Sequence, residues 1–371
     1  MKKRVLSILS LLLILPSLVG CFNYREINKI TFVTSVIFDK DEYDNVQIYL
    51  DCVSPYRNTN ESSDKGKRLV LQGTGKTALE AMRDVDAASS NIINYSQVRA
   101  YIFTEDVAVK GIDKYINLID NNQEFGSKTY MFTYYGDVEA LLNIQNNDEE
   151  YLGLYLDSLI ENNKKNINII FSNVSDYITS TMGKPNISLM SSISIKKDIM
   201  ENKVLLNGAT IMQDNHLIKP LEKDDVVSYN LLTRNVSEGT FQVTNPNDLD
   251  KFVTLDILES SNYNDIKIVD DKVLLTKNIN IRTSIGEVQG KLDLDYDMIN
   301  IIKREEEYKL KRVLEKFFES YKKDNIDILK VERLVKERFA TYDTKDILNK
   351  TELDVNIDLV IDGSSLVSTS K

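Results

Sequence analysis

Few side chains in this sequence could take part in catalysis or bind a metal. The chain has two cysteines, Cys21 and Cys52, and a single histidine, His216. A structural zinc site takes about four histidine or cysteine ligands, so only carboxylate metal sites remain open. A Ser–His–Asp triad would need His216, but no serine lies in the G-x-S-x-G context that exposes a nucleophile. We therefore expect no enzymatic activity, no cofactor and no catalytic residue.

Gly75-Lys76-Thr77 is similar to the end of a phosphate-binding loop, because it follows a strand-like run and precedes a helix-like one. The full motif requires a glycine where Val70 stands. Without that glycine the backbone amides cannot surround a phosphate. We predict a strand-to-helix turn whose glycine allows positive φ.

Two acidic runs, residues 293–297 and 354–358, have the alternating oxygen ligands that open a calcium-binding loop. Met298 and Leu359 stand where the loop needs glycine, and neither run has the glutamate that closes the coordination shell. Both runs alternate with apolar residues, so we interpret them as solvated strand faces and expect no metal site.

The chemistry that the sequence does predict is lipidation of Cys21. Met1–Arg4 is basic, Val5–Leu15 is apolar, and Leu18–Cys21 reads Leu-Val-Gly-Cys. This order is a secretory signal, and its apolar run is shorter than the roughly 20 residues that span a bilayer. We predict cleavage between Gly20 and Cys21, and S-diacylglyceryl and N-acyl groups on Cys21. Two or more acyl chains give stable anchoring.

The rest of the chain is acidic and has no second long apolar run. Removal of residues 1–20 removes three positive charges and no negative ones, which changes the formal net charge from −11 to −14. Such a body is unsuited to nucleic acid and to anionic lipid. The lipid must therefore hold the protein at the membrane. Because Cys52 alternates with Val46, Ile48 and Leu50, we interpret it as a buried strand thiol.

The periodicity of the first half predicts interleaved strands and helices. A hairpin joins Ile30–Phe38 to Val46–Val53, and Ser54–Lys67 is a polar loop. Thr77 and Glu80 could form a capping box. Further strands are expected at Arg68–Gln72, Val98–Thr104 and Thr129–Tyr135, and helices at Thr77–Ser89, Val109–Ile119, Val138–Ile144 and Tyr151–Ile160.

The second half alternates like antiparallel strands and contains long helices. Val204–Met212 and His216–Ile218 predict a hairpin, and Asp225–Leu232 a short helix. Strands are expected at Ile279–Ile285, Leu292–Tyr296 and Leu353–Ile361, and helices at Leu310–Tyr321 and Val331–Phe339. Favourable ion pairs are expected at Glu305–Lys309 and Glu307–Lys311.

These patterns predict a multi-domain α+β fold. About 350 residues exceed one typical core. The helical stripes stop near Gly183–Asn186, so we expect a signal peptide at 1–20, an N-terminal domain at 21–185 and a C-terminal domain at 186–371. The last has room for two sub-domains that divide near 245–265.

Several segments resemble the Ger(x)C family, the C subunits of GerA-type germinant receptors in endospore-forming bacteria. Residues 21–28 and 34–41 resemble the start of the mature family sequence. Residues 73–81, which contain Gly-Thr-Gly followed by Ala-Leu-Glu-Ala, also resemble the family. A longer match covers residues 101–113, and residues 206–218 resemble the family's Gly-Ala hairpin segment. Phe22 and Asn23 replace the usual Trp and Asp, and Lys219 stands where glycine is common. The segments occur in order over the whole mature chain.

The resemblance implies a non-catalytic lipoprotein of three mixed α/β domains, required for germination. It would lie on the outer leaflet of the spore inner membrane beside two integral membrane subunits, of the A and B types. Two alternatives are a substrate-binding lipoprotein of a transporter and a secreted hydrolase. The class of transporter binding proteins favours doubly wound parallel domains. The incomplete catalytic motifs disfavour a secreted hydrolase.

Overall fold

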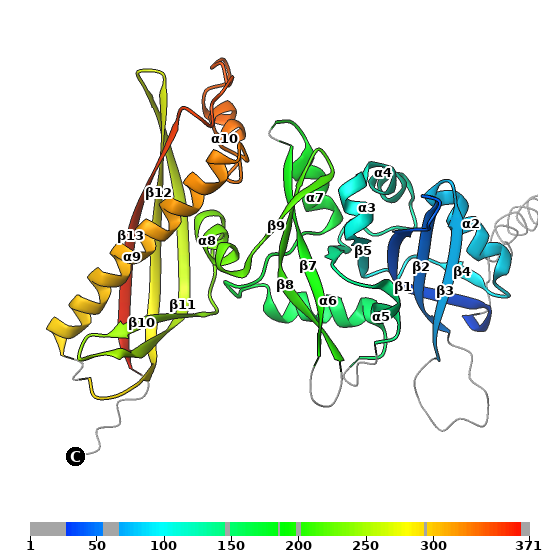
Figure 1. Cartoon of the computed structure of the whole chain (residues 1–371), viewed down its shortest axis with the longest axis horizontal. Coiled ribbons are helices and arrows are strands. Elements are labelled where there is room, and N and C mark those ends of the chain that lie inside the picture. The colour runs from blue at the N-terminus through cyan, green and yellow to red at the C-terminus, as the bar shows by residue number, and fades with distance from the viewer. Residues whose placement is uncertain are drawn as a thin grey trace, which may run out of the picture.

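The computed structural model describes residues 27–54, 67–144, 149–184, 186–197, 202–292 and 295–364. They form two β-sheets at opposite ends of an elongated molecule, with helices packed on each (Figure 1). The mixed α+β class expected from the periodicity is confirmed.

The elements follow one another as η2 (Ile27–Lys29), β1 (Ile30–Lys40), β2 (Val46–Ser54), β3 (Lys67–Gly75), α2 (Ala78–Ala88), β4 (Ile92–Asn94), β5 (Ala100–Thr104), α3 (Glu105–Lys110), α4 (Asp113–Asn121), β6 (Tyr130–Tyr134), α5 (Val138–Leu142), α6 (Leu152–Asn163) and α7 (Val174–Thr181). They continue as β7 (Ile187–Lys197), β8 (Asn202–Gln213), β9 (His216–Leu221), α8 (Lys223–Thr233), β10 (Thr240–Asn245), β11 (Asp248–Val269), β12 (Lys272–Val288), α9 (Tyr296–Lys323), α10 (Val331–Arg338) and β13 (Thr351–Ser364).

The first sheet has nine strands in the order β3-β2-β1-β5-β6-β7-β8-β9, with β4 paired to β1. Its central strands β1, β5, β6 and β7 run parallel, and hairpins add antiparallel strands on both sides. Both faces are covered. Phe38 and Phe103 belong to the core that includes α2, α3 and α4, whereas Ile37 and Ile102 belong to the core that includes α5 and α6. Burial on both faces explains why β5 is apolar at nearly every position.

The second sheet has four strands in the order β10-β11-β12-β13. β11 and β12 form a long antiparallel hairpin, and β13 adds parallel to β12 after the chain has passed through α9 and α10. The 28-residue helix α9 lies along one face of this sheet (Figure 1). Leu310, Leu314, Phe317 and Phe318 are its buried stripe, as the periodicity predicts.

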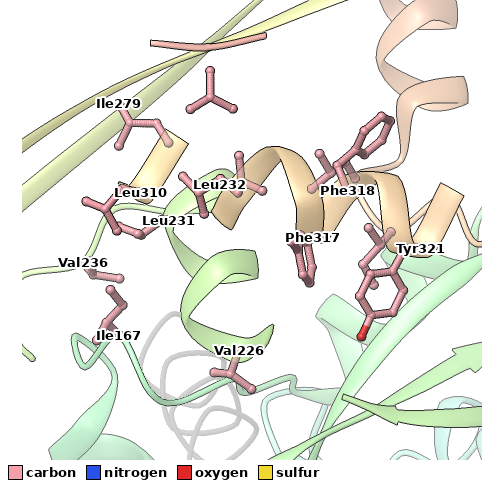
Figure 2. Close-up of a cluster of buried hydrophobic side chains, with 14 of the residues drawn as sticks. Ile167, Val226, Leu231, Leu232, Val236, Ile279, Leu310, Phe317, Phe318 and Tyr321 are labelled. Atoms are coloured by element: carbon pink, nitrogen blue, oxygen red, sulfur yellow. The ribbon is translucent and has the colours of Figure 1, made fainter. Parts of the chain in front are cut away.

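One hydrophobic core joins the two sheets. It contains Ile187 of β7 and Ile211 of β8 together with Leu275 of β12 and Phe317 of α9. Helix α8 lies between the sheets, and Figure 2 shows its Leu231 and Leu232 next to Leu310 of α9, with Val226 at the other end of α8. We call the nine-stranded sheet with its helices the N-terminal unit, and the four-stranded sheet with α9 and α10 the C-terminal unit. The two units are therefore packed against each other through buried apolar side chains.

The expected domain boundary at 185/186 does not coincide with the end of a sheet. Strand β7, which follows it, pairs with β6, which precedes it, through Phe132 and Ser191. The division between sheets falls at α8 instead. The change in sequence pattern near Gly183 has a local cause, because long antiparallel strands replace the earlier strand–helix alternation within the same sheet.

Most of the segment 245–265, where the sequence leaves room for a sub-domain division, lies in the single strand β11. One expectation for the C-terminal half is wrong. Leu292 is not in a strand, and Tyr296 is the first residue of α9, with Asp295 as its N-cap. The apolar–acidic alternation there marks the entry to a helix rather than a strand.

Candidate functional site

Cys21 and Gly20, the site residues that the sequence predicts, lie outside the described residues, as do Phe22, Asn23 and residues 55–66 of the loop expected over Ser54–Lys67. Strand β1 begins at Ile30, at the end of the molecule opposite the four-stranded sheet (Figure 1). No helix within the described ranges is long and apolar enough to cross a membrane.

The Gly75-Lys76-Thr77 segment is a strand-to-helix turn, and its Lys76 amide already has a partner. The Lys76 N–H donates to the Glu80 carboxylate at 2.8 Å, and the Glu80 N–H donates to the Thr77 hydroxyl at 3.1 Å. Thr77 therefore caps α2, and Glu80 reaches one residue further back than in a standard capping box. Gly75 serves close packing rather than positive φ, because an added Cβ would lie 2.6 Å from the backbone N of Ala81.

The remaining sequence candidates are structural as well. Asp354 and Asp358 of β13 form ion pairs with Lys311 and Lys303 of α9, at 2.7 and 3.0 Å. His216 is exposed, and its Nδ1 lies 2.7 Å from the carbonyl oxygen of Asp214. Among the described residues, no group of three or more histidine, cysteine or acidic side chains could hold a metal ion.

The ion pairs along α9 use other partners than expected. Lys303 pairs with Glu307 and Lys311 pairs with Glu315, each at i,i+4. In both pairs the lysine precedes the glutamate, so the register differs from the Glu305–Lys309 and Glu307–Lys311 pairs that the sequence suggests.

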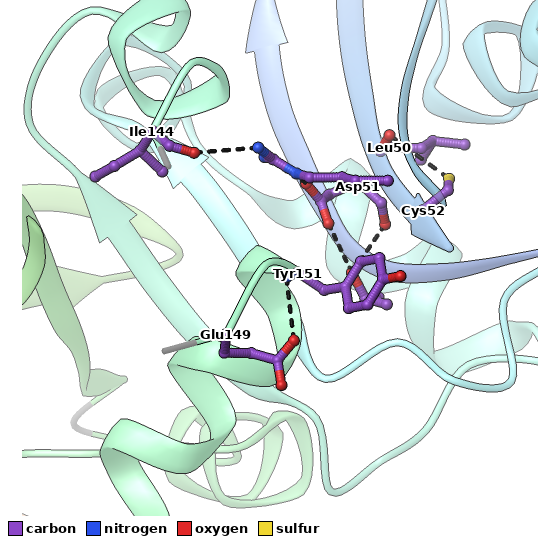
Figure 3. Close-up of polar contacts among 8 residues, drawn as sticks. Leu50, Asp51, Cys52, Ile144, Glu149 and Tyr151 are labelled. Atoms are coloured by element: carbon purple, nitrogen blue, oxygen red, sulfur yellow. Dashed lines mark hydrogen bonds and ion pairs between the residues drawn. The ribbon is translucent and has the colours of Figure 1, made fainter. Parts of the chain in front are cut away.

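A buried ion pair lies in the nine-stranded sheet, between β2 and β3. Asp51 is fully buried, and Nε of Arg68 donates to its carboxylate at 2.6 Å (Figure 3). The Thr34 hydroxyl donates to the other carboxylate oxygen at 2.9 Å, and the Leu152 N–H at the start of α6 donates as well. Burial raises the pKa of the Asp51 carboxyl, and the Arg68 guanidinium opposes that rise. Arg68 also donates to the Ile144 carbonyl at 3.1 Å, which ties the loop after α5 to the sheet.

This pair depends on a direct contact between α6 and β1. A Cβ added at Gly153 would lie 1.9 Å from the carbonyl oxygen of Thr34. The glycine therefore lets the helix backbone rest on the strand, which brings the first turn of α6 to Asp51. Neither Asp51 nor Gly153 stands out in the sequence. Cys52, beside Asp51, points to the opposite face and is a free buried thiol, as predicted.

The four-stranded sheet buries a lysine without a carboxylate. Lys277 of β12 is 3% exposed and lies within the core-facing row. Its Nζ donates at 2.7 Å to the carbonyl oxygen of Leu232 in the last turn of α8. Burial lowers the pKa of Lys277 to about 8. The cation satisfies a carbonyl that the helix leaves free, and it fixes α8 to the sheet.

Two further polar contacts hold the units together. Tyr321 of α9 donates its hydroxyl to the Asp225 carboxylate of α8 at 2.7 Å. Lys219 of β9 pairs with Asp324 at 2.7 Å, and its Nζ lies 4.8 Å from the centre of the Tyr321 ring.

Arg333 of α10 binds the end of α7. Its guanidinium donates to the carbonyl oxygens of Thr179 at 3.0 Å and Met182 at 2.6 Å. A cation at a helix C-terminus is favourable because the last carbonyls have no partner within the helix. The part of the chain that contains α9 and α10 therefore contacts both α7 and α8.

Comparisons with known proteins agree with this architecture. Residues 23–195 match the family described as "Spore germination protein N-terminal domain", and residues 207–365 match "Spore germination B3/ GerAC like, C-terminal". Spore germination protein GerQC of Bacillus cereus is 22% identical over 278 residues, which are 75% of each chain. The crystal structure of the GerBC protein covers 88% of this chain and 96% of its own, with a TM-score of 0.56 and 14% identity, and so shares the fold.

The two-sheet fold and these matches define a spore germination protein built from an N-terminal and a C-terminal germination domain. The chain belongs to the Ger(x)C family, the C subunits of germinant receptors. The resemblance seen in the sequence is thereby confirmed.

Proposed function

We propose that this protein is a lipid-anchored, non-catalytic subunit of a nutrient germinant receptor. Cys21 carries the diacylglyceryl and N-acyl groups and holds the protein on the outer leaflet of the spore inner membrane. Its partners are the two integral membrane subunits, of the A and B types, of the same receptor. The protein contributes contact surface to this assembly.

The observation that carries the proposal is the ordered match of both family domains across the chain. The elongated shape supports it, because β1 begins nine residues after Cys21 in the sequence and the four-stranded sheet lies at the opposite end of the molecule from β1 (Figure 1). A lipid anchor confines the body to the surface that holds its partners, which raises their effective concentration.

Deletion of the gene tests this proposal. We expect spores that fail to germinate with a subset of nutrients, while nutrient uptake by growing cells is unchanged. A transporter's binding protein would give the opposite pattern, since its loss impairs uptake during growth. Normal germination with every nutrient tested, in a strain that also lacks redundant paralogues, would refute the receptor role.

A further inference from the structure

A cavity of about 300 Å³ opens where the two units meet. Its walls come from both of them. Asp176 of α7 and Asn230 and Arg234 at α8 line it from one side, and Lys330, between α9 and α10, lines it from the other. The cavity therefore lies beside the contact between Arg333 and the end of α7.

Three hydrogen bonds hold the Arg234 guanidinium in place and leave its Nε–H unused. Its two terminal nitrogens donate to the carbonyl oxygens of Lys164, Asn166 and Ile169. Its Cζ atom lies over the Phe171 ring, 5.2 Å from the ring centre. The Nε–H is buried without a hydrogen-bond partner. Burial lowers the pKa of Arg234 to about 10.

Lys330 adds a second cation, and its hydrogen bonding is weak. Its backbone is left-handed, at φ 55°, and its Nζ is 3.5 Å from the Ser180 carbonyl oxygen, a long contact for a charged donor. Burial lowers the pKa of Lys330 to about 8. An anion in the cavity would satisfy both cations.

Asn230 supplies a hydrogen-bond acceptor, whereas Arg234 and Lys330 supply donors. It is 1% exposed, and its amide nitrogen donates to the carbonyl oxygens of Ile167 and Ile169, at 2.6 and 3.0 Å. Those two bonds fix the orientation of the amide and leave Oδ1 buried without a partner. A buried acceptor without a donor is costly, so a matching donor is expected there. The Asp176 carboxylate also lines the cavity and favours a donor over a second anion.

We propose that this cavity binds a small organic acid that also carries an amino or hydroxyl group. Its carboxylate binds Arg234 and Lys330, and its donor binds Asn230. Because both units form the walls, the bound acid stabilises their contact.

Calorimetric titration of the full-length lipidated protein in detergent tests the proposal. Glycine and lactate have both groups, acetate lacks the donor, and glycinamide lacks the carboxylate. We expect glycine or lactate to bind at least tenfold more tightly than acetate, and glycinamide not to bind, because each lost partner leaves a buried polar atom unsatisfied. Binding of acetate as tight as that of glycine and lactate would contradict the donor role of the ligand.

Lys330→Met should weaken binding about tenfold or more, since a charge-assisted bond is lost. Arg333→Met is the matched control. It removes a cation from the same junction but not from the cavity wall, so binding should persist. Absence of heat with both glycine and lactate, in protein that unfolds cooperatively, would overturn the proposal, as would equal loss in both variants.

Discussion

In the nine-stranded sheet, the buried carboxylate of Asp51 meets the guanidinium of Arg68, whereas in the four-stranded sheet the buried Lys277 meets only the carbonyl oxygen of Leu232. Both charges lie on inner strands and both receive a contact from a helix end. The first is balanced by an opposite charge and three hydrogen-bond donors. The second is balanced by one carbonyl dipole.

This difference predicts opposite responses to the same substitution. Removal of one member of a buried ion pair leaves an uncompensated charge, which is strongly destabilising. Removal of a lone buried cation takes away a desolvation penalty and leaves only an unpaired carbonyl. We infer that Asp51 and Arg68 support the fold of the N-terminal unit, and that Lys277 fixes the position of α8 at a cost in stability.

The largest effect is expected for Arg68→Met. The variant leaves the Asp51 carboxylate buried without its cation, so the free energy of unfolding should fall by about 3–5 kcal/mol. Urea unfolding followed by circular dichroism measures it. The double variant Asp51→Asn/Arg68→Met should recover most of this loss, because no charge remains buried. Equal losses in the single and double variants would show that the ionic balance is unimportant.

Lys277→Met should act in the other direction. At pH 7 we expect a gain of about 1–2 kcal/mol, because the relief of charge burial exceeds the loss of one hydrogen bond. The pH dependence identifies the cause. Since the pKa of Lys277 is about 8 in the folded state and 10.5 ordinarily, the unfolded chain binds the proton more tightly. The contribution of Lys277 to the free energy of unfolding of the native chain therefore rises as pH rises from 8 to 10.5.

The advantage of Lys277→Met over the native chain should consequently shrink over that pH interval and then change sign, because the native chain gains up to about 3 kcal/mol as Lys277 loses its proton. Unfolding curves at pH 7, 9 and 10.5 provide the test. A difference that stays constant across these pH values would contradict burial of a charged lysine.

The smallest effect is expected for Tyr321→Phe. The variant removes the hydroxyl that donates to Asp225 but keeps the packed ring, so stability should fall by about 1 kcal/mol. Hydrogen exchange should show faster opening of α8 and α9 and unchanged protection of β5 in the nine-stranded sheet. Equal loosening of both regions would mean that this bond does not act locally at the junction.

Much of the secondary structure could be predicted from residue patterns, because the hairpins, α8 and the stripe of α9 follow simple periodicities. The expected boundary at 185/186 falls within the nine-stranded sheet, because pairing between β6 and β7 is a long-range property that local patterns do not contain. Strand β11 was missed because apolar Phe252 and Leu258 lie on its exposed face and the polar run 259–262 interrupts the alternation of Val253, Leu255 and Ile257.

The buried charges were missed for related reasons. From the alternating pattern of its strand, Asp51 would be expected to face solvent. It is buried because α6, about a hundred residues further along the chain, covers that face of the strand. A signal for Lys277 was present, since it interrupts the apolar row Val273, Leu275, Ile279 and Ile281. A polar residue within such a row indicates a buried contact.

Purification of the tagged full-length protein from spore inner membranes tests the receptor assignment most directly. We predict that two untagged integral membrane proteins co-purify with it in constant proportion, and that Cys21→Ala reduces their recovery because the body no longer stays at the membrane. Mass spectrometry of the mature protein should show an acylated Cys21 as its first residue. Recovery of the protein alone, or an unmodified first residue at Phe22 or beyond, would contradict the account.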